Sequence, residues 1–228
     1  MKIGGFQKMT MLDFPGKIAC TVFTYGCNLR CPFCHNATLV THKSELFSED
    51  EILAYLNKRK GILDGICITG GEPLLQADII PFMQRVKEIG LAIKLDTNGA
   101  YPDRLKEIID LGLVDYIAMD IKNSKEKYPL TTGIEGLDIT PFEKSVEIIK
   151  NSGVDYEFRT TVVRELHTID DMKKIAEWIS GAKRYYIQCF ADSGELIGEG
   201  FSAHDKNTLE AFCQATLSHI SSAEIRGI

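Results

Sequence analysis

The sequence predicts an α/β fold: an open, partial (β/α)6 barrel whose parallel sheet carries helices on its outer face. Two observations predict it. Short runs of apolar and β-branched residues recur six times, and each is followed by a pattern typical of a helix. Several runs are apolar almost throughout, as expected for strands buried on both faces of a parallel sheet. The runs are Ile18–Thr24, Gly65–Thr69, Ala92–Asp96, Tyr116–Ile121, Tyr156–Val163 and Tyr185–Phe190.

Capping signals mark the helices that follow the first and fourth strands. Ser48 and Glu51 have the spacing of a capping box, and Gly61 stands just past the expected end of that helix. Thr140 followed by Pro141 predicts another N-terminus, with proline at its favoured first helical position. Each of these helices is therefore expected to begin where a polar side chain caps it.

The helix after the fifth strand has the clearest apolar face. Thr168 is expected to cap its N-terminus, and Gly181 is expected to end it. Three further helices are expected over residues 78–90, 102–112 and 205–220. The apolar positions that share one face of the Thr168 helix are Ile169, Met172, Ile175, Ala176 and Ile179.

Length and composition predict one domain, residues 1–228, with residues 1–17 as an N-terminal extension. A closed eight-unit barrel takes about 250 residues, so six units in this chain favour an open one. No apolar run is long enough to cross a bilayer and the N-terminus lacks a signal-peptide pattern, which favours the cytoplasm. A net charge of −6 gives no reason to expect a nucleic-acid or membrane partner.

Three long loops are expected to carry the function, since all of them leave the carboxyl ends of strands. They span residues 25–47, 122–139 and 191–204, whereas the connections from helix to strand are short. Loops longer than about 12–15 residues in a compact domain are usually functional. Ligands in α/β folds bind at this end of the sheet.

The first of these loops holds three of the seven cysteines. Cys27, Cys31 and Cys34 lie within eight residues, and an odd total argues against a disulfide framework. One segment can thus offer three thiolates to an iron–sulfur cube and leave a fourth iron open for substrate. The alternatives are a zinc site completed by His35 or His42, or simply clustered cysteines of the core.

Other motifs at strand ends identify a family. The segment 27–34, CNLRCPFC, resembles the CxxxCxφC signature of the radical S-adenosylmethionine (SAM) superfamily, and residues 69–73, TGGEP, resemble its GGE(P) motif. Residues 96–99, DTNG, residues 120–122, DIK, and the pair His35-Asn36 resemble the glycyl-radical-enzyme activases. The resemblance covers nearly the whole chain, and it implies a barrel of the radical SAM type.

The resemblance implies a [4Fe–4S] cluster in the loop of residues 25–36, held by the three cysteines. The open iron would bind SAM, and reductive cleavage of SAM would make a 5′-deoxyadenosyl radical that takes a hydrogen atom from a glycine of a partner enzyme. The positions that match cofactor-binding residues of the family are Phe33, His35, Gly70, Gly71, Glu72, Asp96, Thr97, Asn98, Asp120, Lys122 and Arg159.

Several of these positions have a plausible chemical role. Without side chains, Gly70 and Gly71 let backbone approach the methionine part of SAM, and Glu72 would accept hydrogen bonds from its ammonium. The matching positions of Asp96 and Asp120 line the SAM site and in some relatives help to hold a monovalent cation. Their alternative role is helix capping.

Four further side chains complete the expected site. Lys122 matches a position near the SAM carboxylate, with a solvated surface charge as its alternative. Phe33 would meet the adenine. Arg159 either contacts SAM or forms a structural ion pair with Asp120 or Glu157, since arginine is rarely buried unpaired.

The role of other candidates is left open by the residues alone. His35 is either a ligand contact or an ordinary surface group. Gln188 ends the sixth strand, where formate-lyase activators tend to carry histidine, so no contact is inferred for it. Cys20, Cys67, Cys189 and Cys213 are expected to be small buried apolar residues.

The N-terminal residues 4–8 and 10–17 most resemble the anaerobic ribonucleoside-triphosphate reductase activating proteins in their longer form. Such a protein would act on a glycyl radical enzyme and take electrons from a flavodoxin- or ferredoxin-like donor. Pyruvate formate-lyase activators usually show Val-Asp-Gly-Pro-Gly where this chain has Leu-Asp-Phe-Pro-Gly. The alternatives are such an activator, a small-molecule enzyme such as a 7-carboxy-7-deazaguanine synthase, or a non-enzymatic metal-binding module.

Overall fold

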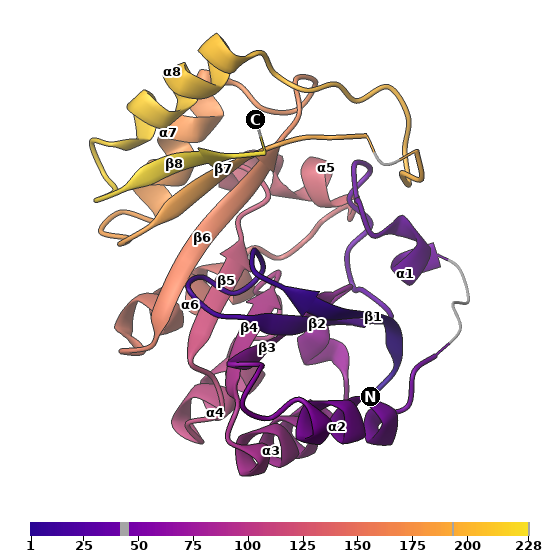
Figure 1. Cartoon of the computed structure of the whole chain (residues 1–228). Coiled ribbons are helices and arrows are strands. Elements are labelled where there is room, and N and C mark those ends of the chain that lie inside the picture. Colours follow the sequence, from indigo (N-terminus) through magenta and orange to yellow (C-terminus); the bar gives the residue numbers. More distant parts are fainter. Residues whose placement is uncertain (42–45, 193, 228) are drawn as a thin grey trace.

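The computed structural model describes residues 1–41, 46–192 and 194–227. One sheet of eight strands runs in sequence order from β1 to β8 (Figure 1). β1 pairs antiparallel with β2, and every later neighbour is parallel. The strands are β1 (Ile3–Thr10), β2 (Ala19–Thr24), β3 (Gly65–Gly70), β4 (Ala92–Thr97), β5 (Tyr116–Asp120), β6 (Asp155–Val162), β7 (Tyr185–Cys189) and β8 (Ala223–Arg226).

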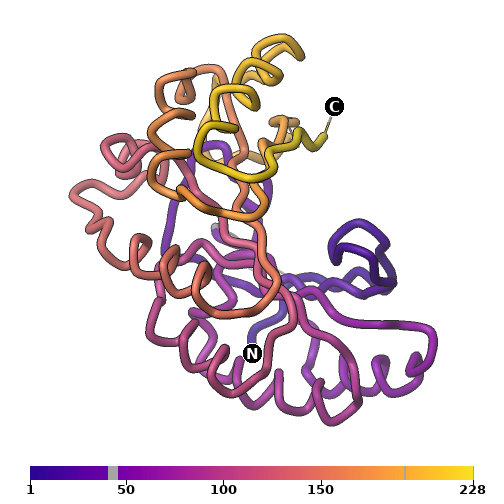
Figure 2. Tube along the Cα trace, turned by 90° about the vertical axis from the view of Figure 1, so that its left-hand side faces the viewer, coloured from indigo at the N-terminus to yellow at the C-terminus, as the bar shows by residue number. Residues whose placement is uncertain are grey.

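Helices follow the outer face of the curved sheet, and the sheet stays open between its two edge strands (Figure 2). Each longer helix lies between two parallel strands in the chain. These helices are α2 (Glu49–Lys58), α3 (Ile79–Ile89), α4 (Pro102–Asp110), α6 (Thr140–Asn151), α7 (Ile169–Trp178) and α8 (Lys206–Thr216). Short ones lie in the connections: α1 (Ala37–Thr41), α5 (Tyr128–Thr132), and the 3-10 turns η1 (Pro73–Leu75) and η2 (Lys125–Lys127).

All six predicted strands are present, and an open parallel barrel with outer helices is confirmed. Two strands were not predicted. β1 lies in the segment expected to be only an extension, and its exposed, polar Gln7 and Lys8 weaken any strand pattern. β8 has four residues at the end of the chain, which is too short for a periodic signal.

The predicted capping signals are confirmed in two helices and wrong in one. Ser48 and Thr168 both form capping boxes, the second with Asp171. Thr140, by contrast, is the first residue of its helix, and its side chain does not cap the helix. The Asp138 carboxylate instead accepts the Thr140 backbone N–H at 2.9 Å. The predicted face of the Thr168 helix is buried except for its first residue, since Ile169 is 41% exposed.

The apolar core lies between the sheet and its helices, and it joins residues of all the long helices. Polar side chains instead occupy much of the concave side of the sheet, where the carboxyl ends of the strands meet the long loops. Within the described residues, no helix is both long enough and apolar enough to cross a membrane.

Candidate functional site

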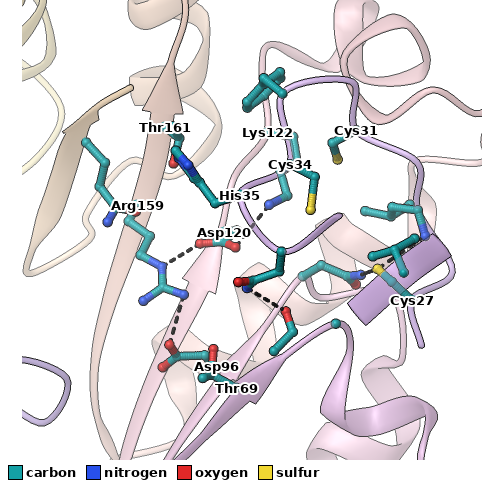
Figure 3. A pocket seen from close by; sticks show the side chains of 18 of the residues that line it. Cys27, Cys31, Cys34, His35, Thr69, Asp96, Asp120, Lys122, Arg159 and Thr161 are labelled. Atoms are coloured by element: carbon teal, nitrogen blue, oxygen red, sulfur yellow. Dashed lines mark hydrogen bonds and ion pairs between the residues drawn. The ribbon is translucent and has the colours of Figure 1, made fainter. Parts of the chain in front are cut away.

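A cavity of about 280 Å³ opens at the carboxyl ends of β3 to β7. The first long loop supplies its thiols and the second supplies Lys122, while other charged groups come from strand ends (Figure 3). It is lined by Cys27, Leu29, Cys31, Phe33, Cys34, His35, Asn36, Val40, Thr69, Gly70, Gly71, Asp96, Thr97, Asn98, Asp120, Lys122, Arg159, Thr161, Gln188 and Cys189. Every predicted site residue except Glu72 lines this cavity.

The cysteine loop, residues 25–36, is held in place by backbone hydrogen bonds to other parts of the chain. Gly26 N–H donates to the Leu39 carbonyl at 2.9 Å, and Arg30 N–H donates to the Thr132 carbonyl of α5 at 2.9 Å. From the third long loop, Gly198 N–H reaches the carbonyl of Pro32 at 2.7 Å. The loop therefore presents its three thiols from a fixed backbone.

Burial changes the acidity of the thiols that face the cavity. Burial raises the pKa of Cys31 to about 12 and also raises the pKa of Cys27, where a hydrogen bond from the Leu29 amide opposes it. A metal must therefore displace the protons that Cys27 and Cys31 hold at neutral pH, which makes its binding pH-dependent. All seven cysteines of the chain are free.

Gly70 and Gly71 are needed for a structural reason that the sequence analysis did not give. A Cβ on Gly71 would lie 2.0 Å from the Gly26 carbonyl oxygen, and one on Gly70 would lie 2.4 Å from the Thr24 backbone nitrogen. Gly70 also has a φ of 113°, which side-chain-bearing residues rarely adopt. The glycines thus let β3 pack against the start of the cysteine loop, while their backbone still lines the cavity.

Glu72 lies beneath the cavity rather than in its wall, and its side chain is fully buried. Its carboxylate accepts hydrogen bonds from Leu74 N–H at 3.0 Å, Thr97 Oγ1 at 2.8 Å and Asn98 N–H at 2.7 Å. Burial raises its pKa to about 7 against these three donors. Because Glu72 does not line the cavity, its contact with a SAM ammonium stays a prediction.

Charged side chains at the ends of the strands form the charged row, which we define as Lys94, Asp96, Arg159, Asp120 and Lys122. The Lys122 end of the row lies beside Cys34 (Figure 3). Arg159 joins the carboxylates at the ends of β4 and β5: its guanidinium is 3.0 Å from Asp96 Oδ2, and its Nε donates to Asp120 Oδ1. Lys122 Nζ donates to Asp120 Oδ2 at 3.0 Å, and Lys94 donates to Asp96 Oδ1. Figure 3 shows Arg159 between the two aspartates.

The pairing keeps both aspartates ionised. Burial alone would raise the pKa of Asp96 and Asp120, but Arg159 and the two lysines lower both below their ordinary value. Three cations face two carboxylates, so the row carries one net positive charge. Lys94 does not line the cavity, so the two cations and two carboxylates of the row that do line it balance.

The charged row contains one of the ion pairs expected for Arg159, whose contact with SAM stays a prediction, and it contains a residue that the sequence analysis missed. Arg159 forms the predicted ion pair with Asp120. Glu157 is not a partner of Arg159, because its Oε1 lies 2.6 Å from Nη1 of Arg226. Lys94 was missed, although a lysine inside an otherwise apolar strand is an unusual signal. Neither Asp96 nor Asp120 caps a helix.

Aromatic and imidazole groups form the side of the cavity next to the third long loop. Phe33 packs with Val163 and Phe190 in a small apolar cluster, and the His35 ring lies 5.5 Å from the Phe190 ring. Burial, followed by the charge of Lys122, lowers the pKa of His35, so its imidazole is neutral at pH 7. These side chains give the cavity an apolar wall beside its charged one.

His167 was missed by the sequence reasoning, and it connects two of the cavity's loops. Val163 N–H donates to its Nδ1 at 3.1 Å, which leaves Nε2–H to donate to the Lys122 carbonyl at 2.9 Å. Its ring also packs edge-on against Phe33 with centroids 6.0 Å apart. No motif marks this residue in the sequence, because its role depends on the fold.

The remaining cysteines do not behave alike. Cys20 and Cys67 are fully buried as predicted, whereas Cys189 and Cys213 are only half-buried. Cys189 lines the cavity beside Gln188 at the end of β7. The expectation of small buried apolar residues is therefore confirmed for two cysteines and wrong for the other two.

The closed zinc site is not formed by the described side chains. No three His, Cys, Asp or Glu groups among them come close enough together to hold a single metal ion. His35 faces the cavity and packs on Phe190 instead of completing such a set. His42, the other proposed ligand, lies outside the described residues.

Comparison with known proteins gives a consistent family. Residues 21–179 match a family model described as the radical SAM superfamily. The chain is 33% identical over 198 residues to a Methanocaldococcus jannaschii protein named as a glycyl-radical enzyme activating enzyme, MJ1227, which covers 82% of this chain and 79% of that protein. It is 32% identical over 191 residues to the pyruvate formate-lyase-activating enzyme of Clostridium pasteurianum, covering 80% of this chain and 77% of that enzyme.

The fold is also similar to solved structures. Streptococcus suis SuiB bound to S-adenosylmethionine superposes with a TM-score of 0.68 at 14% identity. The match covers 89% of this chain and 48% of that chain. At this identity the likeness concerns the fold alone.

Proposed function

The chain belongs to the radical SAM superfamily as an enzyme that activates glycyl radical enzymes, and from that premise we propose that its substrate is an anaerobic ribonucleoside-triphosphate reductase. The N-terminal residues 12–16, LDFPG, carry the choice of the reductase. The cavity lined by three thiols of one loop supports the chemistry itself. The family implies a [4Fe–4S] cluster and SAM. When bound, the cluster supplies the electron that cleaves SAM, and the resulting 5′-deoxyadenosyl radical removes a hydrogen atom from a glycine.

The donor set suits such a cluster. Cys27, Cys31 and Cys34 would hold three irons, and thiolates are the usual ligands of iron–sulfur clusters. Their negative charge would be opposed by Lys122, the cation that acts on both Cys27 and Cys31. The Leu29 N–H already donates to Cys27 Sγ at 3.4 Å, as expected beside an electron-rich sulfur.

The charged row suits the amino-acid part of SAM, which carries an ammonium and a carboxylate. Lys122 would meet the SAM carboxylate as a point charge. Asp96 and Asp120 would accept from the ammonium, because each carboxylate oxygen retains a second lone pair beside its present partner. A monovalent cation at these aspartates stays a prediction, and it would compete with Arg159.

The remaining predicted residues would shape the pocket. Phe33 and His35 would meet the adenine from the apolar wall, and the backbone of Gly70 and Gly71 would lie along the methionine part. Thr97 would act through its hydrogen bond to Glu72 rather than by touching the ligand. Electrons would come from a flavodoxin- or ferredoxin-like donor.

Pyruvate formate-lyase is the second candidate substrate, and the identity to the Clostridium pasteurianum enzyme favours it. The N-terminal residues 12–16, LDFPG, favour the reductase, because formate-lyase activators usually carry a different sequence there. The two candidates share one chemistry and differ in the protein partner. They are therefore separated only by offering both partners.

The experiment is anaerobic reconstitution with iron and sulfide, reduction with dithionite, and addition of SAM with either partner enzyme. We expect 5′-deoxyadenosine and a glycyl radical signal on the reductase. Cys34→Ser is expected to abolish both, and Cys213→Ser, which changes a thiol of α8 outside the cavity, is expected to leave both unchanged. A radical on formate-lyase alone would select the second candidate, and turnover of a free small molecule would reject both.

A further inference from the structure

The side-chain amide of Asn98 lies against the sulfur of Cys27. Its Nδ2 is 3.8 Å from Cys27 Sγ, and the Leu29 amide reaches the same sulfur. Among the described residues, the sulfurs of Cys31 and Cys34 receive no hydrogen bond. Two N–H donors therefore converge on one of the three thiols.

The orientation of this amide is set by its other partners. Ala100 N–H donates to Asn98 Oδ1 at 2.9 Å, so the oxygen cannot be exchanged with the nitrogen. One hydrogen of Nδ2 is then directed to Asn28 Oδ1 at 2.9 Å, and the other faces Cys27. Rotation of the amide would break the contacts with both Ala100 and Asn28.

The backbone that carries this amide is fixed from below. Glu72 Oε2 accepts from Asn98 N–H at 2.7 Å, and Glu72 Oε1 accepts from the hydroxyl of Thr97. That hydroxyl in turn accepts from Gly99 N–H at 3.1 Å. A fully buried side chain after β3 thus holds the turn after β4 against the cysteine loop.

We propose that Asn98, held by Glu72, is a positioning residue that raises the reduction potential of the iron–sulfur cluster by donating a hydrogen bond to Cys27. A hydrogen bond to a ligand sulfur stabilises the more negative, reduced cluster more than the oxidised one. Cys27 would be the ligand through which these donors act, because both contact its sulfur. The inference rests on the proposed cluster site.

Potentiometric titration followed by electron paramagnetic resonance tests the inference in the reconstituted protein. Asn98→Ala removes the donor, and we expect the equilibrium constant for one-electron reduction to fall about tenfold, which is about 59 mV to more negative potential. Asn98→Asp replaces the donor by a negative oxygen and is expected to shift the potential further in the same direction. Asn151→Ala, which removes an exposed amide of α6, is expected to leave it unchanged.

Each result counts for or against the inference. Equal potentials in the Asn98 variants and the Asn151 control would overturn it. So would an Asn98 variant that melts like the parent protein but holds no iron, because retention of the cluster is not the role assigned to Asn98. A parent protein that takes up no iron–sulfur cluster would instead reject the proposed function.

Discussion

At the scale of single residues, Arg159 joins the two halves of the charged row. Its side chain is 15% exposed, and it contacts the carboxylates of Asp96 and Asp120, which end adjacent parallel strands. No other described side chain contacts both aspartates. Its removal would leave two largely buried carboxylates each with a single lysine.

We expect Arg159→Met to lower the free energy of unfolding by about 3 kcal/mol, the usual order for breaking a buried ion pair from one side. Chemical denaturation measures the change. Arg85→Met is the matched control, because Arg85 is 48% exposed and pairs with Asp50 at the surface. Its loss is expected to cost less than about 1 kcal/mol. Equal losses in the two variants would contradict the role of Arg159.

The raised pKa of Glu72 predicts that the free energy of unfolding falls as the pH rises. The lowered pKa values of Asp96 and Asp120 predict the opposite trend. The pKa of Glu72 is about 7 in the folded chain, above its ordinary value of 4.5, so the folded state holds the proton more tightly. Stability from this group is complete below pH 4.5 and is lost as the pH rises through 7. The loss amounts to about 3 kcal/mol, from about 1.4 kcal/mol for each unit of pKa shift.

Glu72→Gln removes this titration, and we expect the fall in stability between pH 4.5 and 7.5 to become shallower by that amount. Urea denaturation of the iron-free parent and variant over this range measures the two slopes. Subtracting one slope from the other removes the contribution of the titrating groups that the parent and the variant share. Parallel pH profiles would show that Glu72 is ionised throughout, as its three hydrogen-bond donors alone would favour.

The residues of the candidate site could be identified from the sequence, but the contacts that they make could not be predicted from it. Gly70, Gly71 and Glu72 stand out because glycines and an acid follow a buried strand. That the glycines are needed by the Gly26 and Thr24 backbone, and that Glu72 holds the next turn, depends on distances between segments that are far apart in the sequence. Local patterns contain no such distances.

At the scale of elements, the connection between β1 and β2 closes the end of the sheet opposite the cavity. Phe14 is 2% exposed and packs on Ala19 and Tyr116, each of which begins a parallel strand. A Cβ on Gly65, the first residue of β3, would lie 3.0 Å from the Phe14 ring. The motif that favours one subfamily in the sequence therefore has a structural role.

We expect Phe14→Ala to lower the free energy of unfolding by about 3–5 kcal/mol, the usual range for a buried aromatic side chain. Guanidinium denaturation measures it. Leu12→Ala lies two residues away in the same connection, but Leu12 is 91% exposed, so its change should stay within about 0.5 kcal/mol. A small loss for Phe14→Ala would mean that this end of the sheet needs no cover.

Elements were predicted best where the pattern was long and repeated. The six central strands alternate with amphipathic helices, and each helix has a capping signal or a clear apolar face, so periodicity identifies both. β1 was missed because only its ends are buried, and β8 because it has four residues. Thr140 shows the limit of capping signals, since Asp138 performs the same task two residues earlier.

At the scale of the whole molecule, the open barrel must stabilise its polar interior without a closing strand. Glu157 of β6 is fully buried, and it accepts two hydrogen bonds from Arg226 of β8, at 2.6 and 2.9 Å, and one from Tyr116 of β5 at 2.8 Å. The Arg226 guanidinium also lies 3.3 Å above the centre of the Tyr186 ring. These contacts cross the concave side of the sheet and tie the last strand to its middle.

Arg226→Met would leave the Glu157 carboxylate buried with only the Tyr116 hydroxyl as partner. We expect it to cost about 3–5 kcal/mol, because an uncompensated buried charge is strongly unfavourable. The double variant Glu157→Met with Arg226→Met removes both charges and should recover most of that loss, since apolar groups of similar volume can replace a buried pair. Denaturation of the parent, both single variants and the double variant measures the coupling. If the double variant lost the sum of the single effects, β8 would be held by its backbone pairing and by α8 rather than by charge.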